Sequence, residues 1–207
     1  MQRKRAQVRR TEILDVTVRI VQDRGMASVR FSDVASSLGV SSALVVYHFE
    51  TKENLLAEAL RHAAERDLLR LRRIVRSTGS TQERLMSALG WYAPTGRARG
   101  WLIWVDAWAA SLRDEVLAAV LSDLQEQWTR AIADLIATGV EEGLFVTDDA
   151  GAAAARITAM LDGLAVRTVV HGHRRGREQL FGWLTRYTAW ELGALPADLE
   201  EAVGSSA

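Results

Sequence analysis

The chain of 207 residues has no cysteine, only two prolines and no run of about 18 uncharged apolar residues. Without cysteine there is neither a disulfide framework nor thiol chemistry, which is compatible with a reducing compartment. Helix-breaking prolines occur only at Pro94 and Pro196, and alternating strand-like runs are few. The basic residues 1–10 are not followed by the apolar core of a signal peptide. We therefore expect an all-helical, cytoplasmic protein that does not bind a membrane.

Several signatures of catalysis are also missing. The sequence has no cysteine nucleophile, no Gly-x-Ser-x-Gly elbow, no glycine loop that would cradle a phosphate, and no carboxylate and histidine cluster with ligand spacing. His171 and His173 form a lone His-x-His pair, which is more typical of a helix terminus and loop than of a metal site. We predict no catalytic residue, no metal and no cofactor.

Charge is balanced over the whole chain but not along it. Residues 1–76 hold 15 Lys and Arg against 9 Asp and Glu, whereas residues 77–207 hold 11 against 17. A basic N-terminal third is expected where only that end meets phosphate. Taken alone, the arginine-rich helices are equally well explained as solvated faces.

The pattern over residues 31–56 predicts two short helices, joined by a turn, and the start of a third. Apolar residues have helical spacing in the first two: Phe31, Val34, Ala35 and Leu38, then Val45 and Phe49. Gly39 can take a left-handed conformation and end the first helix, and Ser41 or Ser42 can cap the second. This is a helix-turn-helix, whose second helix normally lies in the DNA major groove.

Three pieces then occur in a characteristic order: Leu38-Gly-Val-Ser41, Tyr47-His-Phe49 and Thr51-Lys-Glu-Asn-Leu-Leu56. Over residues 8–60 the chain resembles the TetR family of ligand-responsive transcriptional regulators. It departs from the family at Val46, where an aromatic residue is usual, and at Arg30, where a threonine is common.

The resemblance implies that DNA-binding residues lie on or beside the second helix of the motif. The set is Ser32, Ser41, Ser42, Ala43, Leu44, Val46, Tyr47, His48 and Lys52. We expect Lys52 to meet a phosphate, Tyr47 and His48 to set register, and Val46 to meet a thymine methyl. The alternative for Val46 is that it only packs.

Helical periodicity and breakers divide the rest of the chain. We expect a DNA-binding domain over 1–50, a connecting helix over 51–76, and a ligand-binding and dimerisation domain over 77–207. Helices are expected at 3–24, 52–76, 81–92, 98–112, 114–142, 148–172 and 177–193, with a frayed tail from 194. Thr147 or Asp148 is expected to cap the helix that begins near 148.

Residues 101–164 resemble, more weakly, one C-terminal subgroup of the family, typified by repressors of the choline-to-glycine-betaine pathway. The marks are Trp101-Leu-Ile-Trp104-Val-Asp-Ala-Trp108, Leu112-Arg-Asp-Glu115, Trp128, Glu142-Gly-Leu-Phe145 and Leu161-Asp-Gly-Leu164. They imply a ligand-binding, dimerising body.

A row of tryptophans gives candidates for the effector site. Trp101, Trp104 and Trp108 share one face of a helix, and Trp128 on another helix can converge with them. Such rings suit a flat apolar ligand or a cation, although tryptophans at this spacing also serve as core. Candidate effector residues are Trp104, Trp108, Trp128 and Asp162, the last of which is alternatively a buried hydrogen-bonding partner. Asp106 points away from the row and is expected to serve another surface.

Together these features predict a homodimeric regulator, interpreted as a repressor, that binds a palindromic double-stranded DNA operator and is released by an unidentified small molecule. The resemblance implies dimerisation through the helices at 148–172 and 177–193, with Leu164 and Leu184 near the centre of the interface. Two alternatives are a small helical ligand carrier or enzyme with a helix-turn-helix-like packing unit, and a membrane-surface protein. The wide apolar arc of the first helix disfavours the latter, because it indicates a buried helix.

Overall fold

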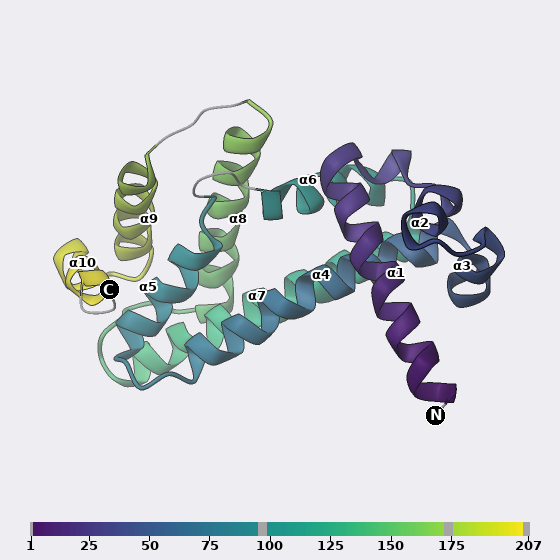
Figure 1. Ribbon diagram of the computed structural model, residues 1–207. Helices are drawn as coiled ribbons and strands as arrows, with labels where there is room; N and C mark the ends of the chain where they lie inside the picture. The colour runs from purple at the N-terminus through teal and green to yellow at the C-terminus, as the bar shows by residue number, and fades with distance from the viewer. Residues whose placement is uncertain (1, 95–98, 172–175, 205–207) are drawn as a thin grey trace. The chain divides into compact units, whose positions relative to one another are not determined.

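The computed structural model describes residues 2–94, 99–171 and 176–204, and within these ranges every regular element is a helix (Figure 1). The predicted all-helical class is therefore confirmed. In chain order the elements are α1 (Gln2–Arg24), the 3₁₀ turn η1 (Met26–Ser28), α2 (Phe31–Leu38), α3 (Ser42–Phe49), α4 (Lys52–Val75), α5 (Thr81–Tyr92), α6 (Arg99–Ser111), α7 (Glu115–Glu141), α8 (Ala150–Val169), α9 (Arg177–Glu191) and α10 (Pro196–Gly204).

The chain forms two compact units. The headpiece unit consists of residues 1–67 and 99–124, and the body unit of residues 68–98 and 125–207. Helix α6 groups with the headpiece unit, where it contacts α1 and η1. The division at residues 50 and 76 stays a prediction about domains.

The helix-turn-helix forms at the predicted residues. Gly39 takes the left-handed conformation, with φ 65° and ψ 34°, and the Val40 amide donates to the Ala35 carbonyl at 3.0 Å. The Ser41 hydroxyl then accepts from the Leu44 amide at 3.3 Å and caps α3. One apolar face of each helix is buried: Val34 and Ala35 on α2, and Val45 and Phe49 on α3.

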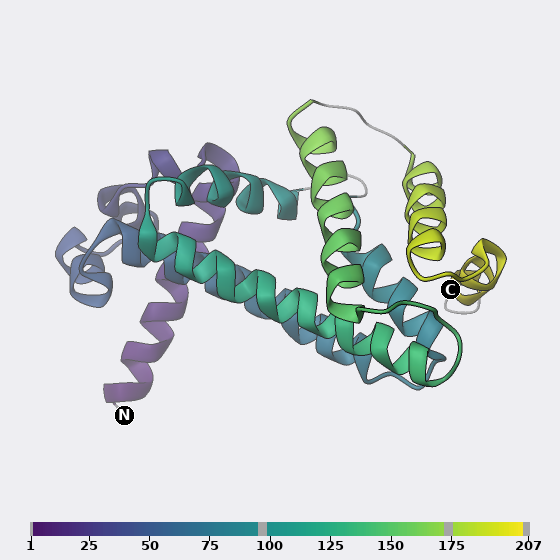
Figure 2. The ribbon, with the colours of Figure 1, turned by 180° about the vertical axis from the view of Figure 1, so that it is seen from behind.

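The body unit has its own apolar core, to which the last part of α4 and helices α5, α7, α8, α9 and α10 contribute. Figure 2 shows these helices from behind. The fully buried side chains of this core include Leu85, Leu89, Ile132, Ile136, Ile157, Leu161, Leu184 and Leu199. The prediction of a frayed tail from residue 194 was wrong, because α10 packs on α5 and α9 and Leu199 is fully buried. Proline at its first position suits a helix start, since its missing N–H has no partner there in any helix.

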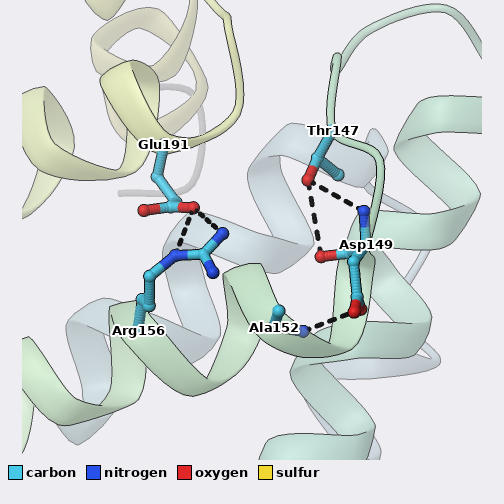
Figure 3. Close-up of polar contacts among 5 residues, drawn as sticks. All are labelled: Thr147, Asp149, Ala152, Arg156 and Glu191. Carbon is cyan, nitrogen blue, oxygen red and sulfur yellow. Dashed lines mark hydrogen bonds and ion pairs between the residues drawn. The ribbon is translucent and has the colours of Figure 1, made fainter.

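Figure 3 shows how α8 begins and how it is joined to α9. Asp149, rather than the predicted Thr147 or Asp148, is the N-cap, since its carboxylate accepts from the Ala152 amide at 2.9 Å. The Thr147 hydroxyl bonds to the backbone of Asp149 instead. Farther along, Arg156 donates to Glu191 from Nε at 2.9 Å and ties α8 to the last turn of α9.

Within the described ranges, no helix combines the length and apolarity needed to cross a membrane.

Candidate nucleic-acid interface and effector site

The predicted DNA-binding residues lie on or beside α2, α3 and α4 of the headpiece unit, and most of them are exposed. Tyr47 is 79% exposed and Val46 42%. Leu44, His48 and Lys52 are half-buried, and the others are exposed: Ser32, Ser41, Ser42 and Ala43. A short helix that buries Val45 and Phe49 must turn its other face outward. The arrangement is therefore that of a recognition helix available to a groove.

Arg10, which the sequence analysis did not single out, holds the end of this helix. Its guanidinium donates to the His48 carbonyl at 2.6 Å, forms an ion pair with Glu58 on α4, and lies 4.4 Å from the centre of the Phe49 ring. Burial, followed by the charges of Arg10 and Arg9, lowers the pKa of His48. The lowered pKa favours the neutral imidazole at this end of α3.

Lys52 has a protein partner in this structure. Its Nζ donates to the Ala27 carbonyl in η1 at 2.8 Å. An ammonium has three N–H donors, so two remain for other acceptors. The phosphate contact assigned to Lys52 stays a prediction.

In the body unit, two of the predicted effector residues, Trp128 and Asp162, meet through Tyr92, which was not predicted. The ring of Tyr92 stacks on Trp128 with 4.1 Å between centroids, and its hydroxyl donates to Asp162 at 3.3 Å. The centroid of the Trp91 ring lies 6.0 Å from that of Trp128. Helices α5, α7 and α8 thus bring three aromatic rings and one carboxylate together.

Two polar groups of this cluster, the Asp162 carboxylate and the Trp128 indole N–H, have too few partners to compensate for their burial. Burial raises the pKa of Asp162 to about 6, although the hydrogen bond from Tyr92 lowers it. The indole Nε1 of Trp128 is buried and has no acceptor among the described residues. Buried polar groups usually have partners, so both groups suit a site that takes a polar or charged ligand.

The remaining predicted effector residues lie in the headpiece unit. Trp104 and Trp108 on α6 are half-buried, and Trp108 lies 6.1 Å from the largely buried Trp101. Tyr92 was missed because a single tyrosine before a break in the pattern has no periodic neighbour to draw attention to it. The adjacent aromatic pair at residues 91–92 was the available signal.

Metal ligands do not cluster anywhere in the described part of the chain, where no group of three or more His, Asp or Glu side chains could hold an ion. His171 is exposed at the end of the α8 segment, and His173 lies outside the described residues.

Comparison with known proteins decides between a regulator and a helical carrier or enzyme. Residues 13–59 match the model of the bacterial regulatory proteins of the tetR family, and residues 81–193 match that of the BetI-type transcriptional repressor C-terminal domain. The chain belongs to the TetR family. This TetR-family protein is accordingly a ligand-responsive, DNA-binding transcriptional regulator and not an enzyme.

Individual relatives agree with this TetR-family assignment. The chain is 25% identical to the HTH-type transcriptional regulator BetI of Cronobacter sakazakii over 94% of this chain and 96% of that one. It is 27% identical to the HTH-type transcriptional repressor KstR2 of Mycobacterium tuberculosis over 68% and 70%. A solved structure of a transcriptional regulator from Saccharomonospora viridis, in complex with choline, is 30% identical, with a TM-score of 0.79 over 87% of this chain and 95% of that one.

Proposed function

We propose that this TetR-family protein is a cytoplasmic homodimeric repressor that binds a palindromic operator and is released by a small quaternary ammonium compound such as choline. The observation that carries the choice of effector is the meeting of Tyr92, Trp128 and Asp162 in the body unit. The similar regulator from Saccharomonospora viridis was solved with choline, which supports the same ligand class here.

The chemistry of the cluster fits a small organic cation. Aromatic faces attract a quaternary ammonium through the ring quadrupole, and a carboxylate adds a full opposite charge. Choline also carries a hydroxyl, whose oxygen can accept from the unsatisfied Trp128 indole N–H. Each of the three protein groups therefore has a counterpart on the ligand.

Entry of the ligand requires a local rearrangement. The Tyr92 and Trp128 rings stack directly on each other, so the ammonium group must separate them. Tyr92 is the last residue of α5, and its hydroxyl bonds to Asp162, so this bond must also break when the ring moves. We infer that the cation replaces Tyr92 on the Trp128 face and pairs with ionised Asp162.

The effector proposal is tested by titrating the protein with choline and with 3,3-dimethylbutan-1-ol, a neutral molecule of the same shape. We expect choline to bind and quench tryptophan fluorescence, and the neutral alcohol to bind at least tenfold more weakly. Trp128→Ala should abolish choline binding, whereas Trp128→Phe, which keeps an aromatic face, should retain part of it. Equal binding of the two ligands would refute recognition of the charge.

Trp104 and Trp108 remain proposed effector residues on α6. Replacing either with alanine should leave operator affinity nearly intact while weakening release by choline. If choline releases the operator equally well from both variants and from the unmodified protein, Trp104 and Trp108 serve only in packing.

Dimerisation is supported by the outward faces of α8 and α9. Small residues follow one another at every fourth position along the exposed face of α8: Gly151, Ala155, Ala159 and Gly163. On α9, Arg186 is exposed and Trp190 is 75% exposed, and a groove of about 630 Å³ borders this helix. Small side chains allow a second helix to approach closely, and exposed tryptophan is costly without a partner.

Of the two residues first chosen for the interface, Leu184 needs correction, because it is fully buried in the core of the body unit and stabilises the subunit itself. Leu164 on α8 is half-buried and stays a prediction. Ala159→Glu is the sharper test, because the side chain is already exposed. We expect this variant to sediment as a monomer and Ala119→Glu, the same change at an exposed alanine of α7, to stay dimeric. A dimeric Ala159→Glu protein would place the interface elsewhere.

A further inference from the structure

Asp106 on α6 bonds to the turn that precedes the helix-turn-helix. Its Oδ2 accepts from the Met26 amide, the first N–H of η1. Gly25 precedes this amide with φ 81°, and a Cβ on it would lie 3.2 Å from the same oxygen. Glycine is suited to this position for two reasons, because it tolerates the positive φ and leaves room for the carboxylate.

Lys52 contacts the middle residue of the same turn. The Lys52 ammonium donates to the Ala27 carbonyl at 2.8 Å. The turn η1 is therefore bound by two charged side chains, because the Asp106 carboxylate accepts from its first amide. Both charges are complementary to the peptide dipoles that they meet. Lys52 opens α4, three residues after Phe49 ends the recognition helix.

The apolar contacts of α6 in the headpiece unit do not define such a precise position. Ile103 and Ala107 are buried, but apolar burial is non-directional and tolerates sliding. A charge-assisted hydrogen bond constrains both distance and direction. The carboxylate of Asp106 is thus a directional link between α6 and η1.

We propose that Asp106 is a positioning residue for operator binding, which acts through η1 and Lys52 to hold the start of α4 and the end of the recognition helix. Lys52 then raises operator affinity through its bond to Ala27, in addition to any contact that it makes with a phosphate. Because the two side chains act on one three-residue turn, the loss of either releases the same element.

A double-mutant cycle tests the link. The probe is a DNA duplex selected from a random library by the unmodified protein, and affinity is measured for Asp106→Ala, Lys52→Ala and the double variant. We expect Asp106→Ala to lower affinity about tenfold, since a hydrogen bond to a charged group contributes on that order. The double variant should be no weaker than the weaker single variant. If the two losses of affinity multiply in the double variant, Asp106 and Lys52 do not act through one shared turn, and the proposal is overturned.

Two controls separate positioning from general damage. Glu115→Ala removes an exposed carboxylate from the same unit and should leave affinity unchanged, while Asp106→Asn keeps an acceptor oxygen and should retain affinity within about threefold. Hydrogen exchange on the free protein should show faster exchange of the Met26 amide in Asp106→Ala but not in Asp106→Asn. Unchanged exchange in a folded Asp106→Ala protein, or equal losses of affinity in both Asp106 variants, would refute the role of the carboxylate.

Discussion

At the residue scale, Asp162 couples the stability of the body unit to pH. Its pKa rises from 3.8 to about 6 on folding, so between these values the native state binds more protons than the unfolded state. Stability therefore falls as pH rises from about 4 to about 6, and the cost persists above that range. Asp162→Asn removes the ionisation and keeps an acceptor for Tyr92. We expect it to raise the free energy of unfolding by about 3 kcal/mol at pH 8 and about half as much at pH 5.

Urea unfolding at the two pH values measures this difference. The same variant should bind choline more weakly at pH 8, because the counter-charge is gone. Stability would then be gained where function is lost, as at many binding sites. An equal gain at pH 5 and pH 8 would show that the carboxylate is not the source of the effect.

Val46 is the residue from which we expect sequence discrimination. It is exposed beside Tyr47 on the recognition helix and is short enough to reach a thymine methyl. Val46→Ala should change the ranking of operator variants, by about 1 to 3 kcal/mol at the affected base pair. Tyr47→Phe serves as the control, since loss of a hydroxyl that sets register should weaken all operators alike. A uniform loss of affinity in Val46→Ala would assign this side chain to packing.

At the scale of elements, the helix boundaries were predicted because their signals lie in neighbouring residues. The side-chain pairs that were missed join residues far apart in the sequence. Gly25, Gly39 and Ser41 end or cap helices through neighbouring residues, so the sequence predicted those boundaries closely. Arg10 meets His48 across 38 positions and Tyr92 meets Asp162 across 70, and neither pairing has a local signature. The motif thus identified the candidate DNA-facing residues, whereas the effector cluster needed the fold.

Helix α10, which was not predicted, can be tested at two leucines. Leu199 is fully buried, whereas Leu195, just before the helix, is 67% exposed. Leu199→Ala should lower the free energy of unfolding by about 2 to 5 kcal/mol, because it leaves a cavity, and Leu195→Ala should change it by less than about 0.5 kcal/mol. Chemical denaturation followed by circular dichroism compares the two. Similar small effects would mean that α10 adds nothing to the core.

At the scale of the whole molecule, one coupling free energy between the operator site and the effector site governs both repression and release. If choline weakens operator binding by some factor, the operator must weaken choline binding by the same factor, whatever motion connects the sites. Factors of about 5 to 150 are typical of such coupling. A dimer that binds both ligands can release DNA only through this difference in affinity.

We therefore expect choline to bind the protein–operator complex with a larger dissociation constant than the free protein. Saturating choline should raise the dissociation constant of the operator by the same ratio. Fluorescence titration of choline, with and without the duplex, gives the first ratio, and DNA-binding isotherms give the second. Trp128→Ala should bind the operator normally and show no response to choline, which separates loss of the effector site from loss of the headpiece. If choline binds the free and DNA-bound protein equally well, the cation site is real but choline is not the signal that releases the operator.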